Sequence, residues 1–370
     1  MISYFETAMS NEFRDLTKDD IFSQIKKLIS DRLEEANLLL DKEEFNDYCS
    51  KREEIGNRLI QKIRNKISHL NIRNLEIVRL SFPSMLFSGY TYGMIISELL
   101  DINENNRADA AWNNALAYSL AVILDVILDN NPYLFDSLGT VLCVIFIETL
   151  RKSKEICKII KKDVNYDEKV VVIYEIISKM FKNNITDLLK KTDSKIRNEY
   201  LKIFDETLQS ELLKGKGLGN FPTIDEIYDY LRNRNTLMFW WMALICIAYN
   251  PSKKIISNLS KWKKFILTFG DIIWLIDDLA DLVEDIHNSE WNIVIIRILK
   301  EEGLIFDKKE LGPDNLKKLI EIMNKHDILD LMIDELLSKL NYIKKYCDFI
   351  GKSSEDILEL LKFFFSLNFI

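Results

Sequence analysis

Glycine and proline are scarce in this sequence, with 11 Gly and 5 Pro among 370 residues. Because these residues interrupt helices more strongly than any others, their scarcity leaves room for long helices. No segment alternates apolar and polar residues as a half-buried strand does, and no repeat or low-complexity linker is present. Apolar residues nevertheless make up 48% of the chain, enough for a large buried core. We therefore predict an all-α fold of about a dozen helices.

Basic residues are also in deficit, since 50 Lys and Arg against 58 Asp and Glu give a net charge of −8. Proteins that bind nucleic acid generally carry a basic surface, so nucleic acid is not expected as a partner. The apolar runs at 119–129 and 236–249 are too short or too acidic to cross a bilayer, which takes about 20 apolar residues. The N-terminal stretch has neither a basic start nor an apolar core, so no signal peptide is expected.

Cysteine and histidine form no metal-binding or disulfide pattern. The five cysteines are an odd number, and no two of them are spaced as in a CxxC motif. The three histidines do not cluster in the sequence. These features are typical of buried, reduced thiols in a cytosolic protein, so a cytoplasmic location is expected.

The order of charged and apolar segments predicts how the chain is divided. Charged N-terminal helices are expected over 1–72, packed on a main helical domain over 73–370. The helices expected within the main domain cover 82–100, 110–129, 223–249 and 259–288, with two more between 166 and 213 and a charged set at the C-terminus. The Gly-rich stretch 214–222 is expected to be a loop.

The stretch "WLIDDLADLVEDI" at 274–286 carries five carboxylates and no Lys or Arg. We call these five residues the acidic row; they are Asp277, Asp278, Asp281, Glu284 and Asp285. On a helix they share an arc of about 120°, opposite a stripe of apolar residues. Trp274 lies within the same arc. One interpretation is a solvated helix face.

Solvated faces normally mix charges, however, because like charges one turn apart repel each other. Divalent cations would compensate the repulsion within the acidic row. Carboxylates at i, i+4 and i+8, here Asp277, Asp281 and Asp285, suit Mg²⁺, which takes one or two carboxylates per ion and completes its shell with water and phosphate. The sequence therefore predicts a site for several Mg²⁺ ions.

A second acidic pair, Asp125 and Asp129, lies one turn apart in an otherwise apolar helix. Asn114, Tyr118 and Ala121 share its face. Carboxylates in such a setting are costly unless they are paired or bound to metal, and the helix dipole disfavours them near a helix C-terminus. The alternative is a pair that simply reaches solvent at the end of the helix.

Two aspartate motifs in an all-α chain of this size resemble the class I isoprenoid (terpene) synthase superfamily. In that family two such helices face each other across a central active-site cavity within one helical bundle and hold Mg²⁺ ions that bind a prenyl diphosphate. The first family motif is DDxxD; here "DVILD" keeps Asp125 and Asp129, and Val126 replaces the second Asp. The second cyclase motif, N/D-D-L-x-S/T-x-x-x-E, is similar to "DDLADLVED", with Asp277, Asp281 and Asp285 at the ligand positions. Prenyl synthases have a plain DDxxD there, which Asp277, Asp278 and Asp281 also satisfy.

Two flanking stretches extend the resemblance. "FPTIDEIYDYLRNRNT" looks like the cyclase segment P-S/T-x-E-E-Y-x-x-x-R, whose arginine senses diphosphate. Tyr228 and Arg232 have that spacing, and Arg234 is the alternative. "SEWNIVI" resembles the family's tail after the second motif and places Asn292.

Two family features are missing from this chain. The GK…R segment with which prenyl synthases bind their five-carbon cosubstrate is not apparent. The C-terminal arginine–tyrosine pair of cyclases is absent, and "KKYC" at 344–347 is only a loose substitute. The first absence favours cyclisation or elimination over chain elongation.

The resemblance thus implies a Mg²⁺-dependent terpene synthase, a carbon–oxygen lyase that converts a farnesyl, geranylgeranyl or longer diphosphate to a hydrocarbon or alcohol. The resemblance gives catalytic roles to six residues, Asp125, Asp129, Arg232, Asp277, Asp281 and Asp285, of which the five aspartates are also the metal ligands. Substrate contacts fall to Arg232, Arg234, Tyr118, Trp274, Phe239 and Trp240. Aromatic side chains of this kind would stabilise a carbocation, although ordinary core packing explains them equally well.

Three alternatives stay open. The chain could be a trans-prenyl diphosphate synthase, or a condensing enzyme similar to squalene and phytoene synthases. It could instead be a non-catalytic helical subunit that binds a true synthase, for which the Val126 substitution leaves room. A homodimer remains a candidate assembly.

Overall fold

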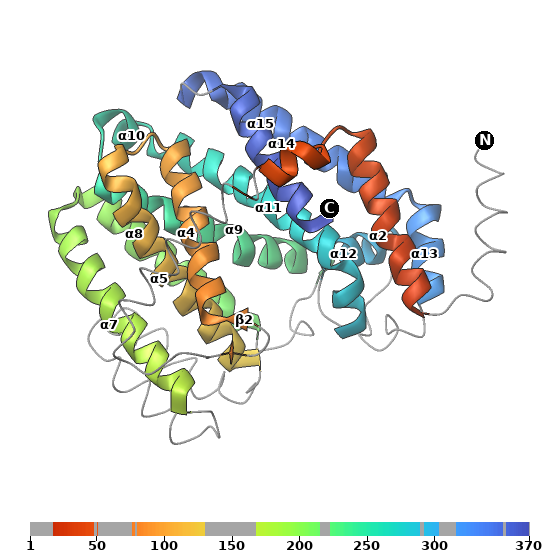
Figure 1. Cartoon of the computed structure of the whole chain (residues 1–370), viewed down its shortest axis with the longest axis horizontal. Helices are drawn as coiled ribbons and strands as arrows, with labels where there is room; N and C mark the ends of the chain where they lie inside the picture. The colour runs from red at the N-terminus through yellow and green to blue at the C-terminus, as the bar shows by residue number, and fades with distance from the viewer. Residues whose placement is uncertain are drawn as a thin grey trace. The chain divides into compact units, whose positions relative to one another are not determined.

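A computed structural model describes residues 18–47, 50, 76–77, 80–129, 168–214, 223–288, 292–302, 316–350 and 353–369. These residues are almost entirely helical (Figure 1), which confirms the predicted all-α class. Within the described ranges the strands are β1 (Glu76–Ile77) and β2 (Leu80–Ser81), which pair antiparallel. The sequence gives no sign of this short ladder because two residues are too few to show alternation.

The helices follow the predicted segments closely. In chain order they are α2 (Lys18–Glu35), α4 (Phe82–Leu99), α5 (Glu104–Asp129), α7 (Glu168–Lys191), α8 (Ser194–Lys214), α9 (Ile224–Tyr249), α10 (Lys253–Ser257), α11 (Leu259–Asn288), α12 (Ile293–Glu302), α13 (Leu316–Lys325), α14 (Ile328–Ile350) and α15 (Ser354–Phe369). The predicted helices over 82–100, 110–129, 223–249 and 259–288 correspond to α4, α5, α9 and α11. The loop was predicted over 214–222, but Lys214 is still part of α8. Residues 215–222 and the domain boundary after residue 72 lie outside the described residues.

The chain forms two compact units, which we describe separately. Unit 1 comprises Met1–Tyr48, Thr223–Asp229 and Asp271–Ile370, and unit 2 comprises Cys49–Pro222 and Tyr230–Gly270. Both α9 and α11 contribute residues to each unit.

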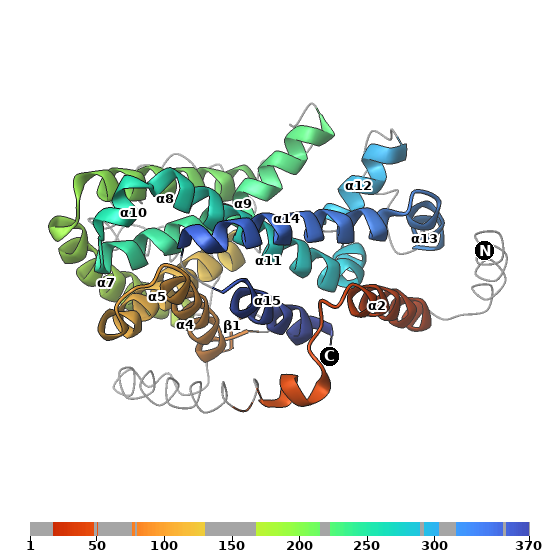
Figure 2. The same ribbon diagram turned by 90° about the horizontal axis from the view of Figure 1, so that it is seen from above.

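In unit 2, α4 and α5 lie side by side (Figures 1 and 2). The turn between them is closed by Asp101, whose φ of 53° lies in the left-handed region and ends α4. Two glycines one turn apart on α4 allow the close approach. A Cβ atom at Gly93 would lie 2.7 Å from the Cα of Ala111, and one at Gly89 would lie 2.8 Å from the Cα of Ala115. No side chain fits between the two backbones at these positions.

The core of unit 2 includes the apolar run 236–249 of α9. Its residues from Trp240 to Ile247 are almost completely buried. Burial within a helical unit explains the apolar run without a bilayer. None of the helices in the described part of the chain is long and apolar enough to span a membrane.

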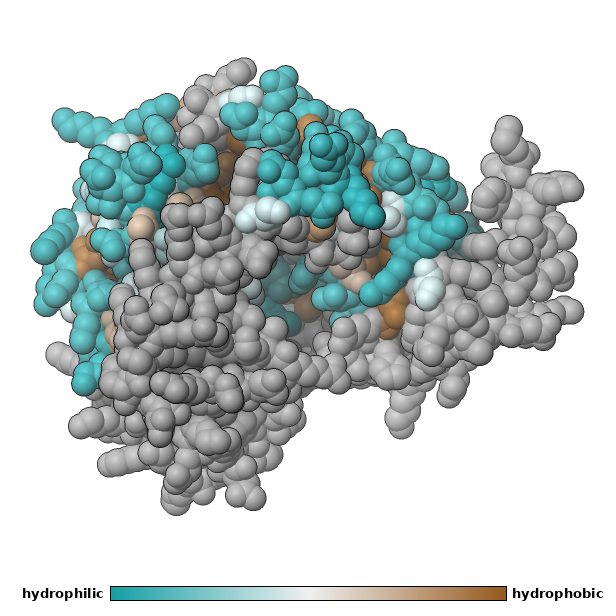
Figure 3. Space-filling view, in the orientation of Figure 1, coloured by the Kyte–Doolittle hydropathy of each residue, from teal (hydrophilic) through white to brown (hydrophobic). Residues whose placement is uncertain are grey.

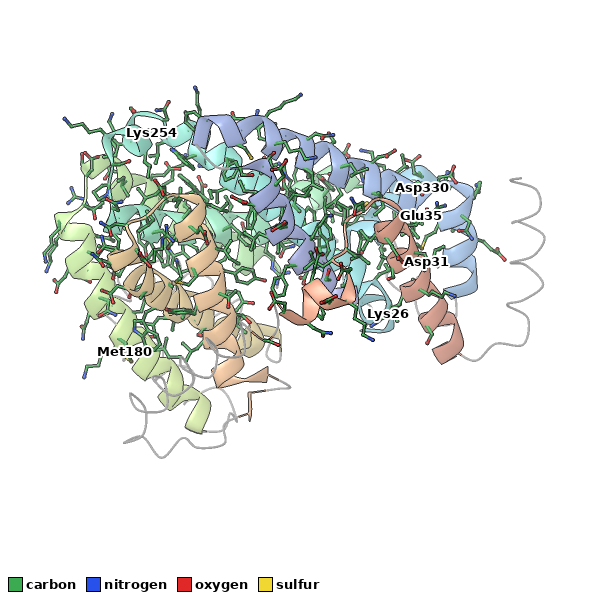
Figure 4. The ribbon with its side chains drawn as sticks, turned by 45° about the horizontal axis from the view of Figure 1, so that its top comes forward. Lys26, Asp31, Glu35, Met180, Lys254 and Asp330 are labelled. Atoms are coloured by element: carbon green, nitrogen blue, oxygen red, sulfur yellow. The ribbon has the colours of Figure 1, made fainter. Side chains whose placement is uncertain are left out.

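In unit 1, the described N-terminal residues pack against the C-terminal helices, whereas the predicted packing of 1–72 as a whole on a domain over 73–370 stays a prediction. The backbone N–H of Leu40 donates to Ser366 Oγ of α15 at 2.8 Å. The rings of Phe45 and Phe363 lie 6.2 Å apart. Figure 4 shows α2 beside the start of α14, where Arg32 pairs with Asp330 at 3.4 Å.

On the face shown in Figure 3 the described residues are mostly hydrophilic.

Candidate functional site

The acidic row lies in the second half of α11, within unit 1, and the helix is amphipathic as predicted. Asp277 and Asp281 are exposed, and Asp278 and Asp285 are half-buried. The apolar side of the same turns is fully buried; it includes Leu275, Leu279, Leu282 and Val283. The side chain of Glu284 lies outside the described residues. The sequence pattern therefore gives the correct orientation of the helix.

Asn292, which the sequence motif singles out, joins α11 to the start of α12. It is fully buried, and its Oδ1 accepts the backbone N–H of Val294 at 2.9 Å, so it is the N-cap of α12. Its Nδ2 donates to the backbone carbonyl of Asp278 at 2.5 Å and to Asp285 Oδ2 at 2.8 Å. Asn292 thereby fixes two members of the acidic row.

Asp278 has a structural partner as well. Its Oδ2 accepts the backbone N–H of Ile293 at 2.7 Å, at the first turn of α12. A carboxylate at a helix N-terminus satisfies an otherwise unpaired N–H group and interacts favourably with the helix dipole. Asp278 therefore holds α12 in place, whereas Asp277 and Asp281 point to solvent.

The electrostatics of the acidic row indicate negative charge that the protein does not fully compensate. Although the Asp277 side chain reaches solvent, desolvation by the surrounding protein, followed by repulsion from Asp281, raises its pKa to about 6. Desolvation also raises the pKa of Asp278 well above its usual range. The N–H of Ile293 opposes that rise, and the charges of Asp277, Asp285 and Asp281 add to it. A bound cation would relieve both effects.

The described side chains fit Mg²⁺ as a partial coordination set. Asp277 and Asp281 present carboxylates one turn apart on an exposed face, and Mg²⁺ requires only one or two carboxylates when phosphate and water fill the other positions. Over the part of the chain that the structure describes, no group of three or more His, Cys, Asp or Glu side chains could by itself hold a metal ion.

The other predicted motif occupies the C-terminal end of α5, in unit 2. Asp125 and Asp129 are helical and one turn apart, as predicted. Their side chains lie outside the described residues, so their role as ligands stays a prediction.

Arg232 and Arg234, the predicted diphosphate sensors, are half-buried on α9. The helix begins at a Thr223 cap, whose Oγ1 accepts the N–H of Glu226 at 3.2 Å. Both arginines thus lie in the first three turns of a well-defined helix. Their contact with diphosphate stays a prediction.

The structure brings together two of the predicted aromatic residues in unit 2 through a third that the sequence did not single out. The ring of Tyr118 lies 5.8 Å from that of Tyr92, which in turn meets the edge of Phe239 at 5.5 Å. Phe239 continues to Phe269 at 6.0 Å. The sequence did not single out Tyr92 because it is a half-buried aromatic residue in an already apolar helix.

The remaining predicted aromatics lie elsewhere. Trp240 is fully buried, and its Nε1 donates to Glu199 Oε1 of α8 at 3.1 Å. Trp274 is 4% exposed, and its ring lies 5.8 Å from that of Tyr228. Both are packed as core residues in this structure, and their predicted contact with substrate stays a prediction.

A charged network in unit 1 was not anticipated. We call it the ion network; it consists of Tyr228 of α9, Asp271 of α11, Arg297 of α12, and Glu335 and Lys339 of α14. Its members come from four helices. Only Tyr228 belongs to a stretch that the sequence singled out, and there as part of a motif with Arg232, so the sequence did not indicate the network.

Comparisons with known structures identify the fold. Geranylgeranyl pyrophosphate synthetase from the archaeon Geoglobus acetivorans matches with a TM-score of 0.52 and 13% identity, over 85% of this chain and 99% of that one. Geranylgeranyl pyrophosphate synthase from Corynebacterium glutamicum, solved with calcium and isoprenyl diphosphate, matches with a TM-score of 0.51 and 14% identity. The match covers 88% of this chain and 95% of that one. A decaprenyl diphosphate synthase from Rhodobacter capsulatus matches with a TM-score of 0.51 and 11% identity. The match covers 87% of this chain and 97% of that one.

Likeness at this level of identity establishes the fold: the chain has the all-α fold of the class I isoprenoid synthases, as the sequence motifs predict. These three neighbours are prenyl diphosphate synthases. No family model and no curated protein matches the sequence.

Proposed function

We propose that the chain is a Mg²⁺-dependent enzyme that ionises an allylic prenyl diphosphate and joins the resulting cation to isopentenyl diphosphate. The observation that carries this proposal is the fold, which the chain shares along most of its length with synthases that make geranylgeranyl and decaprenyl diphosphates. The acidic row supports it, because α11 presents Asp277 and Asp281 as exposed carboxylates whose mutual repulsion a cation would relieve.

The metal-binding role would belong to the aspartates of both motifs. Asp277, Asp281 and Asp285 would hold Mg²⁺, together with Asp125 and Asp129. When bound, Mg²⁺ supplies Lewis-acid stabilisation of the leaving diphosphate.

The arginines and aromatics would act on the two parts of the substrate. Arg232 or Arg234 would donate charge-assisted hydrogen bonds to the diphosphate. The carbon–oxygen bond would break with its electron pair leaving on the diphosphate. The π electrons of isopentenyl diphosphate would then form the new carbon–carbon bond, and the proton lost from that substrate would pass to the released diphosphate. Tyr118 and Phe239 would stabilise the allylic cation by about 0.5–2 kcal/mol each.

A terpene cyclase is the second candidate, and one contact favours it. The carboxylate of Asp278 is bonded to the N-terminus of α12, so it is engaged in structure rather than directed to solvent. The cyclase ligand spacing uses Asp277, Asp281 and Asp285 and leaves Asp278 out, whereas the prenyl synthase spacing includes it. The lack of a GK…R segment points the same way.

Product analysis separates the candidates. The purified chain is incubated with geranyl, farnesyl or geranylgeranyl diphosphate and Mg²⁺, with and without isopentenyl diphosphate. A longer diphosphate formed only with isopentenyl diphosphate supports elongation. A hydrocarbon or alcohol from a single substrate supports the cyclase or, when two chains are joined, a squalene- or phytoene-type condensation. Intact substrate under all conditions overturns the enzymatic proposal and leaves the non-catalytic subunit.

A further inference from the structure

The ion network forms a continuous set of contacts in unit 1. Lys339 Nζ donates to Asp271 Oδ2 at 3.1 Å and lies 3.4 Å from Glu335 Oε1. Glu335 also pairs with Arg297 and accepts the hydroxyl of Tyr228 at 3.1 Å. Asp271 is 2% exposed, whereas the side chains of Lys339, Glu335 and Arg297 are partly exposed, so the site is partly removed from water.

Tyr228 and Arg297 connect the network to α9. The guanidinium carbon of Arg297 lies 5.5 Å from the centre of the Tyr228 ring, and the ring of Trp274 of α11 lies 5.8 Å from the same ring. One turn away, Lys300 of α12 pairs with Asp225 of α9 at 2.7 Å. Two contacts one turn apart therefore join α12 to the first two turns of α9.

The network meets α11 beside the face that carries the acidic row, at the buried Asp271. Taking about 100° per residue and Asp277 as the origin, Trp274 falls near 60° and Asp271 near 120°, and Asp281 and Asp285 fall between 0° and 100°. Asp271 precedes Asp277 by six residues, which is about 9 Å of helix rise. Contacts at this position fix the rotation of α11 about its axis, and that rotation decides which way Asp277 and Asp281 point.

A purely structural contact would not need these charges. Two acids and two bases in a partly buried site must lose hydration, and apolar residues of similar size often stabilise a fold as well or better. The ion pairs instead define the relative orientation of the helices that carry them, because each bond fixes the direction of both partners. Groups that orient metal ligands in this way typically change metal affinity or activity when they are removed.

We propose that Tyr228 and Glu335 are positioning residues: through the ion network they hold α9, α11, α12 and α14 so that the acidic row is aligned to bind Mg²⁺ with diphosphate. This inference rests on the proposed function of the acidic row. It assigns neither residue a direct contact with the reacting atoms.

The test uses Tyr228→Phe, with Tyr230→Phe as the matched control. Tyr230 lies two residues away on α9, and its hydroxyl donates to the carbonyl of Ser210 at 2.9 Å, so both variants lose one tyrosine hydrogen bond between helices. Binding of Mg²⁺ and inorganic pyrophosphate is measured by titration calorimetry. We expect Tyr228→Phe to weaken binding about tenfold and Tyr230→Phe to leave it unchanged. In turnover, Tyr228→Phe should raise the Mg²⁺ concentration for half-maximal rate and lower kcat.

Glu335→Gln provides a second variant, since it keeps an acceptor for Tyr228 but removes the charge that faces Arg297 and Lys339. Its control is Asp330→Asn on the same helix, which affects only an exposed ion pair with Arg32. Circular dichroism and Tm establish that each variant is folded. Glu335→Gln should weaken Mg²⁺–pyrophosphate binding, and Asp330→Asn should not.

The outcomes separate this inference from the proposed function. A wild-type chain that binds and turns over, with Tyr228→Phe and Glu335→Gln equal to their controls, overturns the positioning role alone. A wild-type chain that neither binds Mg²⁺–pyrophosphate nor releases pyrophosphate overturns both. Weaker Mg²⁺–pyrophosphate binding in Tyr228→Phe and Glu335→Gln, with unchanged binding in their controls, supports both the positioning role and the proposed function.

Discussion

The carboxylate of Asp278 accepts a hydrogen bond from the backbone N–H of Ile293 at 2.7 Å. This contact divides the acidic row by role. Asp278 faces α12 and supports its first turn, whereas its neighbour Asp277 reaches solvent. Adjacent residues of the same type therefore serve structure and, in our proposal, chemistry.

Removal of the Asp278 acceptor should destabilise the fold. In Asp278→Ala the N–H of Ile293 loses its partner, which costs about 1–3 kcal/mol. Asp278→Asn keeps an acceptor oxygen and removes a carboxylate whose pKa is raised by desolvation, so it should be at least as stable as wild type at pH 7. Urea unfolding measures both variants. Equal loss of stability in the two would contradict the assigned role.

Neutralisation of Asp277 should stabilise the metal-free protein. Its pKa is raised from 3.8 to about 6, so the folded state holds the proton more tightly than the unfolded state. This carboxyl therefore lowers stability progressively as pH rises from about 4 to 6, and the loss persists at higher pH. Asp277→Asn should raise the free energy of unfolding at pH 7.5 by less than about 1 kcal/mol, because the exposed group is partly screened by solvent. The gain should vanish near pH 4. Thermal melts in EDTA at both pH values check it, and a variant that is less stable than wild type at pH 7.5 would count against this account.

Mg²⁺ should stabilise the folded chain by mass action. A ligand that binds only the folded state raises the free energy of unfolding by about 2.7 kcal/mol at 100 times its Kd. Mg²⁺ with pyrophosphate should therefore raise Tm in wild type and in Asp330→Asn, and should leave Tm unchanged in an Asp277→Asn/Asp281→Asn double variant. Differential scanning fluorimetry measures the shifts. An equal rise in the double variant would place the ions elsewhere.

The close contact of α4 and α5 should be intolerant of a single methyl group. In Gly93→Ala the new Cβ would lie 2.7 Å from the Cα of Ala111, so one backbone must move, at a cost of about 1–3 kcal/mol. Gly270→Ala is the control, because its Cβ would meet Phe239 Cδ2 at 3.0 Å and a side chain can shift. Chemical denaturation should show the larger loss in Gly93→Ala. A Gly93→Ala protein as stable as wild type would contradict the packing described here.

The sequence predicted the helices well because apolar residues recur with the period of a helix, and because scarce Gly and Pro rarely interrupt that period. It also indicated which side of α11 is apolar, although Trp274, which falls within the arc of acidic residues, is buried. Asn292 was found because it belongs to a local motif.

Other features could not be predicted because they depend on contacts between distant segments. Asp278 and Ile293 are 15 residues apart and meet only when α12 folds back. Tyr228 and Glu335 are 107 residues apart, and no sequence pattern links them. Trp240 and Phe239 are neighbours in sequence, but successive helical positions point about 100° apart, so only Phe239 joins the cluster with Tyr118.

The most direct test of the central claim is Mg²⁺-dependent release of pyrophosphate from an allylic prenyl diphosphate. Geranylgeranyl diphosphate is supplied with isopentenyl diphosphate to the wild-type chain, to Asp277→Asn/Asp281→Asn and to Asp330→Asn. Our account predicts release by wild type and by Asp330→Asn that EDTA abolishes, and no release by the double variant although it is folded. Release by the double variant at the wild-type rate would contradict the assignment of the acidic row as the metal and diphosphate site.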